Sequence, residues 1–170
     1  MLIGIGLLLA RLFLGLGLAS HGAQKLFGWF GGYGIKGTGG FFEGTLGLKP
    51  GPLFAAMSGL GELIGGLLVA IGWLGPIGPA LVISVMVIAI VTVHWNNGFF
   101  NASNGIELPL MNIAGALALT FGGFGAYSID AIAPVAVLAA PTIEWLVIIV
   151  AMIGALLSIV GRKPPAPAAK

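Results

Sequence analysis

Apolar residues dominate this chain in long, unbroken runs rather than in alternating stretches. Five runs approach the length of about 20 residues that a helix needs to cross the hydrocarbon core of a bilayer. These runs cover residues 2–22, 53–73, 80–95, 109–124 and 141–160. Strands of a membrane barrel would alternate in polarity over about ten residues, whereas these runs are apolar throughout. The pattern therefore predicts five membrane-spanning helices.

Composition narrows the class of protein further. The 170 residues are 58% hydrophobic and 7% charged, whereas soluble domains are about 25% charged. This excludes a soluble enzyme and a disordered chain, and seven Lys and Arg residues are too few for a nucleic-acid-binding surface. With no cysteine, the chain has no disulfide, thiolate nucleophile or iron–sulfur ligand. The class that remains is a protein embedded in the lipid bilayer.

Basic residues near the spans predict the orientation of the chain. Three lysines lie between residues 23 and 52, and three basic residues lie between 162 and 170. Five spans place both segments on one side, and the opposite side has no Lys or Arg between its spans. The positive-inside rule then places the N-terminus outside and the C-terminus in the cytoplasm. Because a basic n-region is missing and Arg11 interrupts the first run, we expect a retained helix rather than a cleaved signal peptide.

The connections between spans differ in character. Residues 23–52 contain ten glycines and six aromatic residues, which predicts a segment packed at the membrane interface rather than a flexible linker. Within it, Thr38–Leu48 is predicted as a short interfacial helix capped by Thr38. The Pro- and Ala-rich segment 162–170 is predicted as a disordered, solvated tail.

Two ionisable residues fall inside predicted spans, where charges are costly and need partners. Arg11 interrupts the first span and Glu62 the second, with small residues on the same face of each helix. We predict an Arg11–Glu62 pair between these two helices. Such a pair is either purely structural or part of a cavity.

Four polar residues collect toward the predicted cytoplasmic side. His21 and His94 end two spans, Glu107 precedes another, and Lys25 lies one turn beyond His21. Taken singly, each has a simple structural explanation, such as a bond to a loop carbonyl or a lysine reaching the interface. Their convergence beneath an aromatic-rich loop predicts one polar pocket, whose mouth is covered by Trp29, Trp95, Phe99 and Phe100.

The chemistry of this set favours proton exchange. Histidine changes charge near neutral pH, and a quinone needs hydrogen-bond donors, proton exchange and an apolar slot for its tail. Haem is not favoured and no metal site is predicted. Neither His21 nor His94 has a second metal-binding side chain four positions away on the same helix. We assign proton exchange to His21, Lys25, His94 and Glu107, and ligand binding to Arg11, Glu62, Trp29, Trp95 and Phe99. The cofactor itself is not identified by the sequence.

Four motifs follow one another between residues 7 and 130. The first contains Arg11-Leu12, His21-Gly22, Lys25-Leu26 and the stretch Phe27-Gly28-Trp29-Phe30-Gly31-Gly32. The others are Gly61-Glu62-Leu63 with Gly65-Gly66 and Gly72; His94-Trp95 with Gly98-Phe99-Phe100 and Gly105-Ile106-Glu107; and Tyr127-Ser128-Ile129-Asp130. In this order they resemble the DoxX family of small bacterial membrane proteins. Phe124 departs from a Gly-Pro-Gly turn common in the family, and the fifth span lies beyond its four-helix core.

The resemblance implies an all-α, integral membrane four-helix bundle of DoxX type over residues 1–130. The apolar run near the C-terminus adds a fifth transmembrane helix over 131–161. It also implies the bacterial inner membrane and an association with quinone-linked sulfur oxidation or thiol-stress complexes. The motif residues that it marks are Arg11, His21, Lys25, Glu62, His94 and Glu107.

The residues and the resemblance together point to two alternative functions, one in redox chemistry and one in protein binding. In the first, the chain is the quinone-binding subunit of a redox complex, not a complete enzyme alone, and a partner protein supplies electrons. In the second, it is a non-enzymatic scaffold or chaperone that docks a partner. The small-residue surface from Gly61 to Gly65 serves packing within the chain or a homo-oligomer equally well.

Overall fold

A computed structural model describes residues 2–163. It contains six α-helices in the order α1 (Leu2–Phe27), α2 (Gly34–Gly44), α3 (Gly51–Ile71), α4 (Ile77–Ala89), α5 (Glu107–Gly122) and α6 (Pro141–Ile159). No strand occurs between residues 2 and 163. The structure confirms the predicted all-α membrane bundle. Most of the predicted tail, residues 164–170, lies outside the described residues.

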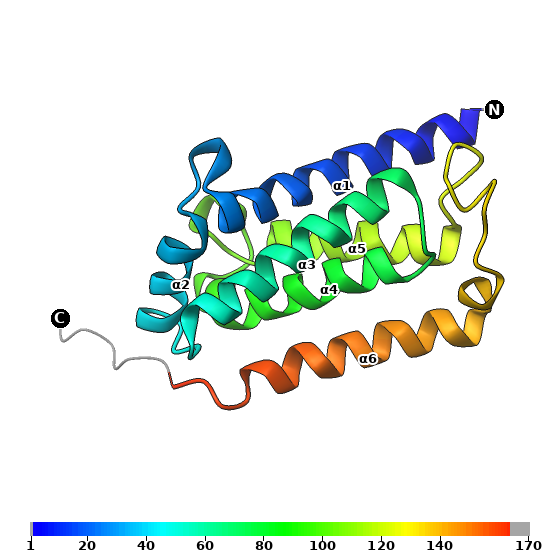
Figure 1. The fold of residues 1–170 in the computed structure, drawn as a ribbon. Coiled ribbons are helices and arrows are strands. Elements are labelled where there is room, and N and C mark those ends of the chain that lie inside the picture. The colour runs from blue at the N-terminus through cyan, green and yellow to red at the C-terminus, as the bar shows by residue number, and fades with distance from the viewer. Residues whose placement is uncertain (1, 164–170) are drawn as a thin grey trace.

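Four segments are long and apolar enough to cross a membrane: α1, α3, α6 and Ile77–Asn97, which extends α4 through a π-helical turn. α5 has 16 residues, so it spans about 24 Å at 1.5 Å per residue, less than the hydrocarbon core of about 30 Å. It nevertheless runs beside the long helices (Figure 1). Four of the five predicted spans are thus long enough to cross a membrane, and a fifth crossing through α5 stays a prediction.

All the α-helices except α2 run side by side, and α2 closes one end of the bundle (Figure 1). α1 packs directly against α3. The two backbones are so close at Gly15 and Gly66 that a Cβ at either position would clash with the other helix. Leu18, Ile83 and Leu119 contribute to one buried core shared by α1, α4 and α5. α6 packs on α4, where the Ser84 hydroxyl donates to the Ala151 carbonyl at 3.1 Å.

Two predicted boundaries are corrected. The first helix does not end near Gly22 but continues to Phe27, because Gly22 packs against α3 and the left-handed residue is Gly28 (φ 74°). His21 and Lys25 therefore belong to the last turns of α1. The interfacial helix begins at Gly34 rather than Thr38, with no side-chain cap, and Thr38 is buried inside it.

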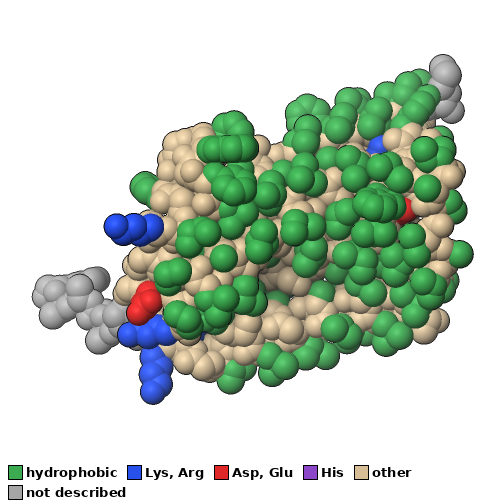
Figure 2. Space-filling view, viewed as in Figure 1, with side chains coloured by type: hydrophobic (Ala, Val, Ile, Leu, Met, Phe, Trp, Pro, Cys, Tyr) green, Lys and Arg blue, Asp and Glu red, His purple; other side chains and the backbone are tan. Residues whose placement is uncertain are grey.

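The two ends of the described chain lie at opposite ends of the bundle (Figure 1). Figure 2 shows apolar side chains over the body of the molecule and most of the visible Lys and Arg side chains at the end where the chain leaves α6. The positive-inside rule predicts that this end faces the cytoplasm. We predict that a green fluorescent protein fused after Lys170 fluoresces and that alkaline phosphatase fused there is inactive.

The matched control for this orientation is the opposite end of the bundle. Alkaline phosphatase fused after Pro134, in the connection between α5 and α6, is expected to be active. Activity of alkaline phosphatase fused after Lys170 would show that the orientation is the reverse of the predicted one and that the α2 end lies at the outer face.

Candidate functional site

A cavity of about 760 Å³ lies at the α2 end of the bundle, between the helices. Its polar lining consists of His21, Gln24, Lys25, Tyr33, Thr38, Ser58, Glu62, Thr92, His94, Asn101, Asn104 and Asn112. Its apolar lining includes Leu18, Phe41, Phe42, Leu46, Leu48, Val85, Met86, Ile88, Val93 and Leu108. One space thus combines a polar region with an extended apolar wall.

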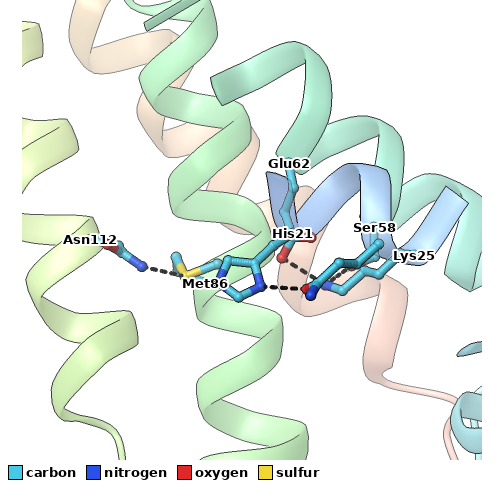
Figure 3. A network of polar contacts seen from close by, with 7 residues as sticks. His21, Lys25, Ser58, Glu62, Met86 and Asn112 are labelled. Atoms are coloured by element: carbon cyan, nitrogen blue, oxygen red, sulfur yellow. Dashed lines mark hydrogen bonds and ion pairs between the residues drawn. The ribbon is translucent and has the colours of Figure 1, made fainter. Parts of the chain in front are cut away.

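A buried ion pair anchors the polar region. Lys25 Nζ donates to Glu62 Oε1 at 2.6 Å and to Ser58 Oγ at 3.0 Å. Figure 3 shows the Lys25 and Glu62 side chains pointing toward one another from α1 and α3. The Lys25 side chain is 25% exposed and the Glu62 side chain 4%. The carboxylate is therefore held inside the bundle by a cation that still reaches solvent.

The predicted Arg11–Glu62 pair is wrong. Because α1 and α3 are antiparallel, Gly15 lies opposite Gly66 and Arg11 lies against Gly72. Gly72 is ten positions beyond Glu62, about 15 Å along a helix. Arg11 and Glu62 therefore lie at different depths in the bundle, and the Glu62 carboxylate pairs with Lys25 instead.

Arg11 lies at the opposite end of the bundle and is completely buried. Its Nη2 donates to the Tyr127 carbonyl at 2.8 Å, and its guanidinium lies 6.0 Å from the centre of the Phe124 ring. The side chain therefore fastens the connection after α5 to the start of the bundle. It does not contribute to the cavity, which corrects its assignment as a ligand-binding residue.

Both histidines line the cavity through different helices. His21 Nδ1 lies 3.1 Å from Gln24 Oε1, and His94 Nδ1 lies 2.7 Å from the Asn104 carbonyl oxygen. His94 ends a π-helical turn, Ile90–His94. Such turns are rare and occur often at functional sites. This one carries Thr92, Val93 and His94 to the cavity wall.

Glu107 does not line the cavity. Its Oε2 accepts a hydrogen bond from the Asn101 amide at 2.8 Å, and its own amide donates to the Phe99 carbonyl at 2.9 Å. The residue closes the connection between α4 and α5 by bonding to the backbone. Glu107 is thus a positioning residue for the His94 loop, which corrects its assignment to proton exchange within the pocket.

The predicted aromatic cover is also corrected. Trp29, Trp95 and Phe99 are 60%, 66% and 50% exposed, and like Phe100 they lie outside the cavity wall. They point to the surroundings, where aromatic side chains favour the membrane interface. The rings at the cavity are Tyr33, Phe41 and Phe42, brought there by α2 and the turn before it.

Sequence reasoning also missed Asn112. Its amide Nδ2 donates to Met86 Sδ at 3.5 Å beside the cavity (Figure 3). An amide inside an apolar helix is itself a signal of a polar site, and that signal could have identified Asn112. Residues 2–163 contain no cluster of three or more His, Asp or Glu side chains that could hold a metal ion.

This arrangement can bind a small molecule that has one polar and one apolar part. The family model DoxX matches residues 6–95, or 90 of the 170 residues, and this range includes His21, Lys25, Glu62 and His94. No curated protein and no solved structure matches the chain. Because the matched region extends over more than half of its length, the chain belongs to the DoxX family.

Proposed function

We propose that this protein is a quinone-binding membrane subunit of a redox complex and that a partner protein supplies the electrons. The observation that carries the proposal is the cavity, in which a buried Lys25–Glu62 pair and two histidines face an apolar wall. Its volume of about 760 Å³ lies within the 300–1,000 Å³ typical of small-molecule sites.

The lining fits the two parts of a quinone. Phe41, Phe42 and Val85 offer an apolar surface for a ring and its tail. Glu62 Oε2 is a buried polar atom with no hydrogen-bond partner among residues 2–163. A head group with an O–H donor, as in the reduced form of a quinone, would supply that missing partner, whereas a purely apolar ligand would leave it unpaired.

A bound quinone supplies two-electron, two-proton redox chemistry. The residues of this chain would hold it and move protons. Histidine is suited to proton exchange near neutral pH, and His21 is exposed to solvent while it lines the cavity. Since the chain has no cysteine, the thiol or sulfur compound that is oxidised would react on the partner protein.

The test is binding of a quinone with a decyl tail, and of its hydroquinone, to purified protein in lipid nanodiscs. We expect at least one of His21→Ala and His94→Ala to weaken binding of the hydroquinone about tenfold, the cost of losing one hydrogen bond of about 1.4 kcal/mol. Lys36→Ala, an exposed position on α2 outside the cavity, should leave binding unchanged.

Mass spectrometry of a solvent extract provides an independent measurement, since a bound quinone should copurify with the protein. If no quinone copurifies with the protein and none binds in the assay, the proposed function is wrong. The scaffold function then becomes the better explanation of the chain.

A further inference from the structure

The cavity contains a buried acceptor without a donor. Glu62 is 3% exposed, and its Oε1 takes the hydrogen bond from Lys25. Its Oε2 is buried and has no partner among residues 2–163. A carboxylate paired with an ammonium group accepts hydrogen bonds and donates none. The group that would complete this site is therefore a hydrogen-bond donor.

Both histidines add acceptors of the same kind. Gln24 Nε2 donates to the Phe30 carbonyl at 3.1 Å, which directs Gln24 Oε1 toward His21 Nδ1. His94 Nδ1 lies against the Asn104 carbonyl. Since both oxygens only accept, each Nδ1 carries the hydrogen, and Nε2 is the acceptor of the neutral ring.

Three donors close to Glu62 and on the facing helices are already engaged. Lys25 uses two of its three ammonium hydrogens on Ser58 and Glu62. The Thr92 hydroxyl donates to the Ile88 carbonyl at 2.7 Å, and the Asn112 amide donates to Met86 Sδ. Other lining groups, such as the Ser58 hydroxyl and the Asn104 amide, keep donors that a ligand can use. None of the donors among residues 2–163 reaches Glu62 Oε2, which is the one buried acceptor at the cavity left without a partner.

The unpaired Glu62 Oε2 distinguishes the two redox forms of the proposed ligand. The carbonyl oxygens of a quinone only accept hydrogen bonds, whereas the two hydroxyls of its hydroquinone donate. We infer that the cavity prefers the hydroquinone, with one hydroxyl donating to Glu62 Oε2 and the other to a histidine Nε2. The inference rests on the proposed function, because it specifies which redox form the same site holds.

Three probes of nearly the same size test the preference on the wild-type protein in nanodiscs: a decyl-benzoquinone, its hydroquinone kept under argon, and the dimethyl ether of that hydroquinone. We expect the hydroquinone to bind at least tenfold more tightly than the quinone, since it pairs a buried acceptor that the quinone leaves unpaired. The ether has no O–H donor, so it should bind as weakly as the quinone.

Failure of the inference differs from failure of the proposed function. A quinone that binds as tightly as the hydroquinone, or an ether that matches the hydroquinone, overturns the inference and leaves quinone binding intact. If none of the three probes binds, the proposed function itself is wrong.

A substitution locates the acceptor. Glu62→Gln replaces one carboxylate oxygen with an NH₂ donor, so the preference for the hydroquinone should fall severalfold. Glu43→Gln is the matched control, because Glu43 lies 3.9 Å from Lys49 in an exposed pair outside the cavity. An undiminished preference in Glu62→Gln would exclude Glu62 as the acceptor. The probe series on the wild-type protein decides the redox preference even where this variant is unstable.

Discussion

Replacing Lys25 with methionine is expected to lower the free energy of unfolding by about 3 kcal/mol. The substitution leaves the Glu62 carboxylate buried without its cation, since the Glu62 side chain is only 4% exposed. Breaking a buried pair by removing one partner costs about 3–5 kcal/mol. We place the loss at the lower end of this range because one quarter of the Lys25 side chain still reaches solvent. Unfolding in a graded series of sodium dodecyl sulfate measures the change.

The double variant Lys25→Met/Glu62→Met should be nearly as stable as the wild type, since no buried charge then lacks a partner. Glu62→Met alone should cost less than Lys25→Met, because Lys25 can turn toward solvent and Glu62 cannot. Lys36→Met, at an exposed position of α2, should have little effect. If the two single losses add up in the double variant, the residues are not coupled.

Substituting alanine at Gly22 is expected to destabilise the bundle by about 2 kcal/mol. A Cβ at this position would lie 2.5 Å from the Leu63 amide nitrogen and 2.6 Å from the Gly59 carbonyl oxygen. These are backbone atoms of α3, so rotating a side chain cannot relieve the clash. The two helices must therefore move apart. Overpacking of this kind costs about 1–3 kcal/mol. The same unfolding titration measures the loss.

Gly17→Ala on the same helix is the matched control. A Cβ at Gly17 meets no atom within 4 Å, and alanine favours a helix over glycine by about 1 kcal/mol. We therefore expect Gly17→Ala to leave stability unchanged or slightly raised. Equal losses at both positions would show that close contact between α1 and α3 is not what requires glycine at Gly22.

Prediction of the fold from sequence succeeded where lipid restricts the alternatives. Apolar runs of this length must satisfy their own backbone hydrogen bonds, so helices were expected, and every predicted run contains a helix. The ends of these helices were less predictable. Gly22 and Gly28 look equivalent in the sequence, yet Gly22 is packed against α3 and Gly28 ends α1.

The candidate site was predictable only in part. Singling out ionisable residues in apolar segments identified His21, Lys25, Glu62 and His94, all of which line one cavity. The same reasoning included Arg11 and Glu107, which bond to the backbone elsewhere. A polar residue in an apolar segment needs a partner, but the segment does not indicate whether that partner is a ligand, a side chain or a carbonyl.

By itself, the sequence determined that this protein is a bundle of membrane helices with costly charges at identifiable positions. Only the tertiary structure decided which charges meet. The choice depends on the relative depth of antiparallel α1 and α3, which contacts such as Gly15 with Gly66 set. A shift of three helical turns is about 16 Å, far beyond the reach of an ion pair. Helix packing therefore paired Glu62 with Lys25 and left Arg11 to hold the opposite end of the bundle.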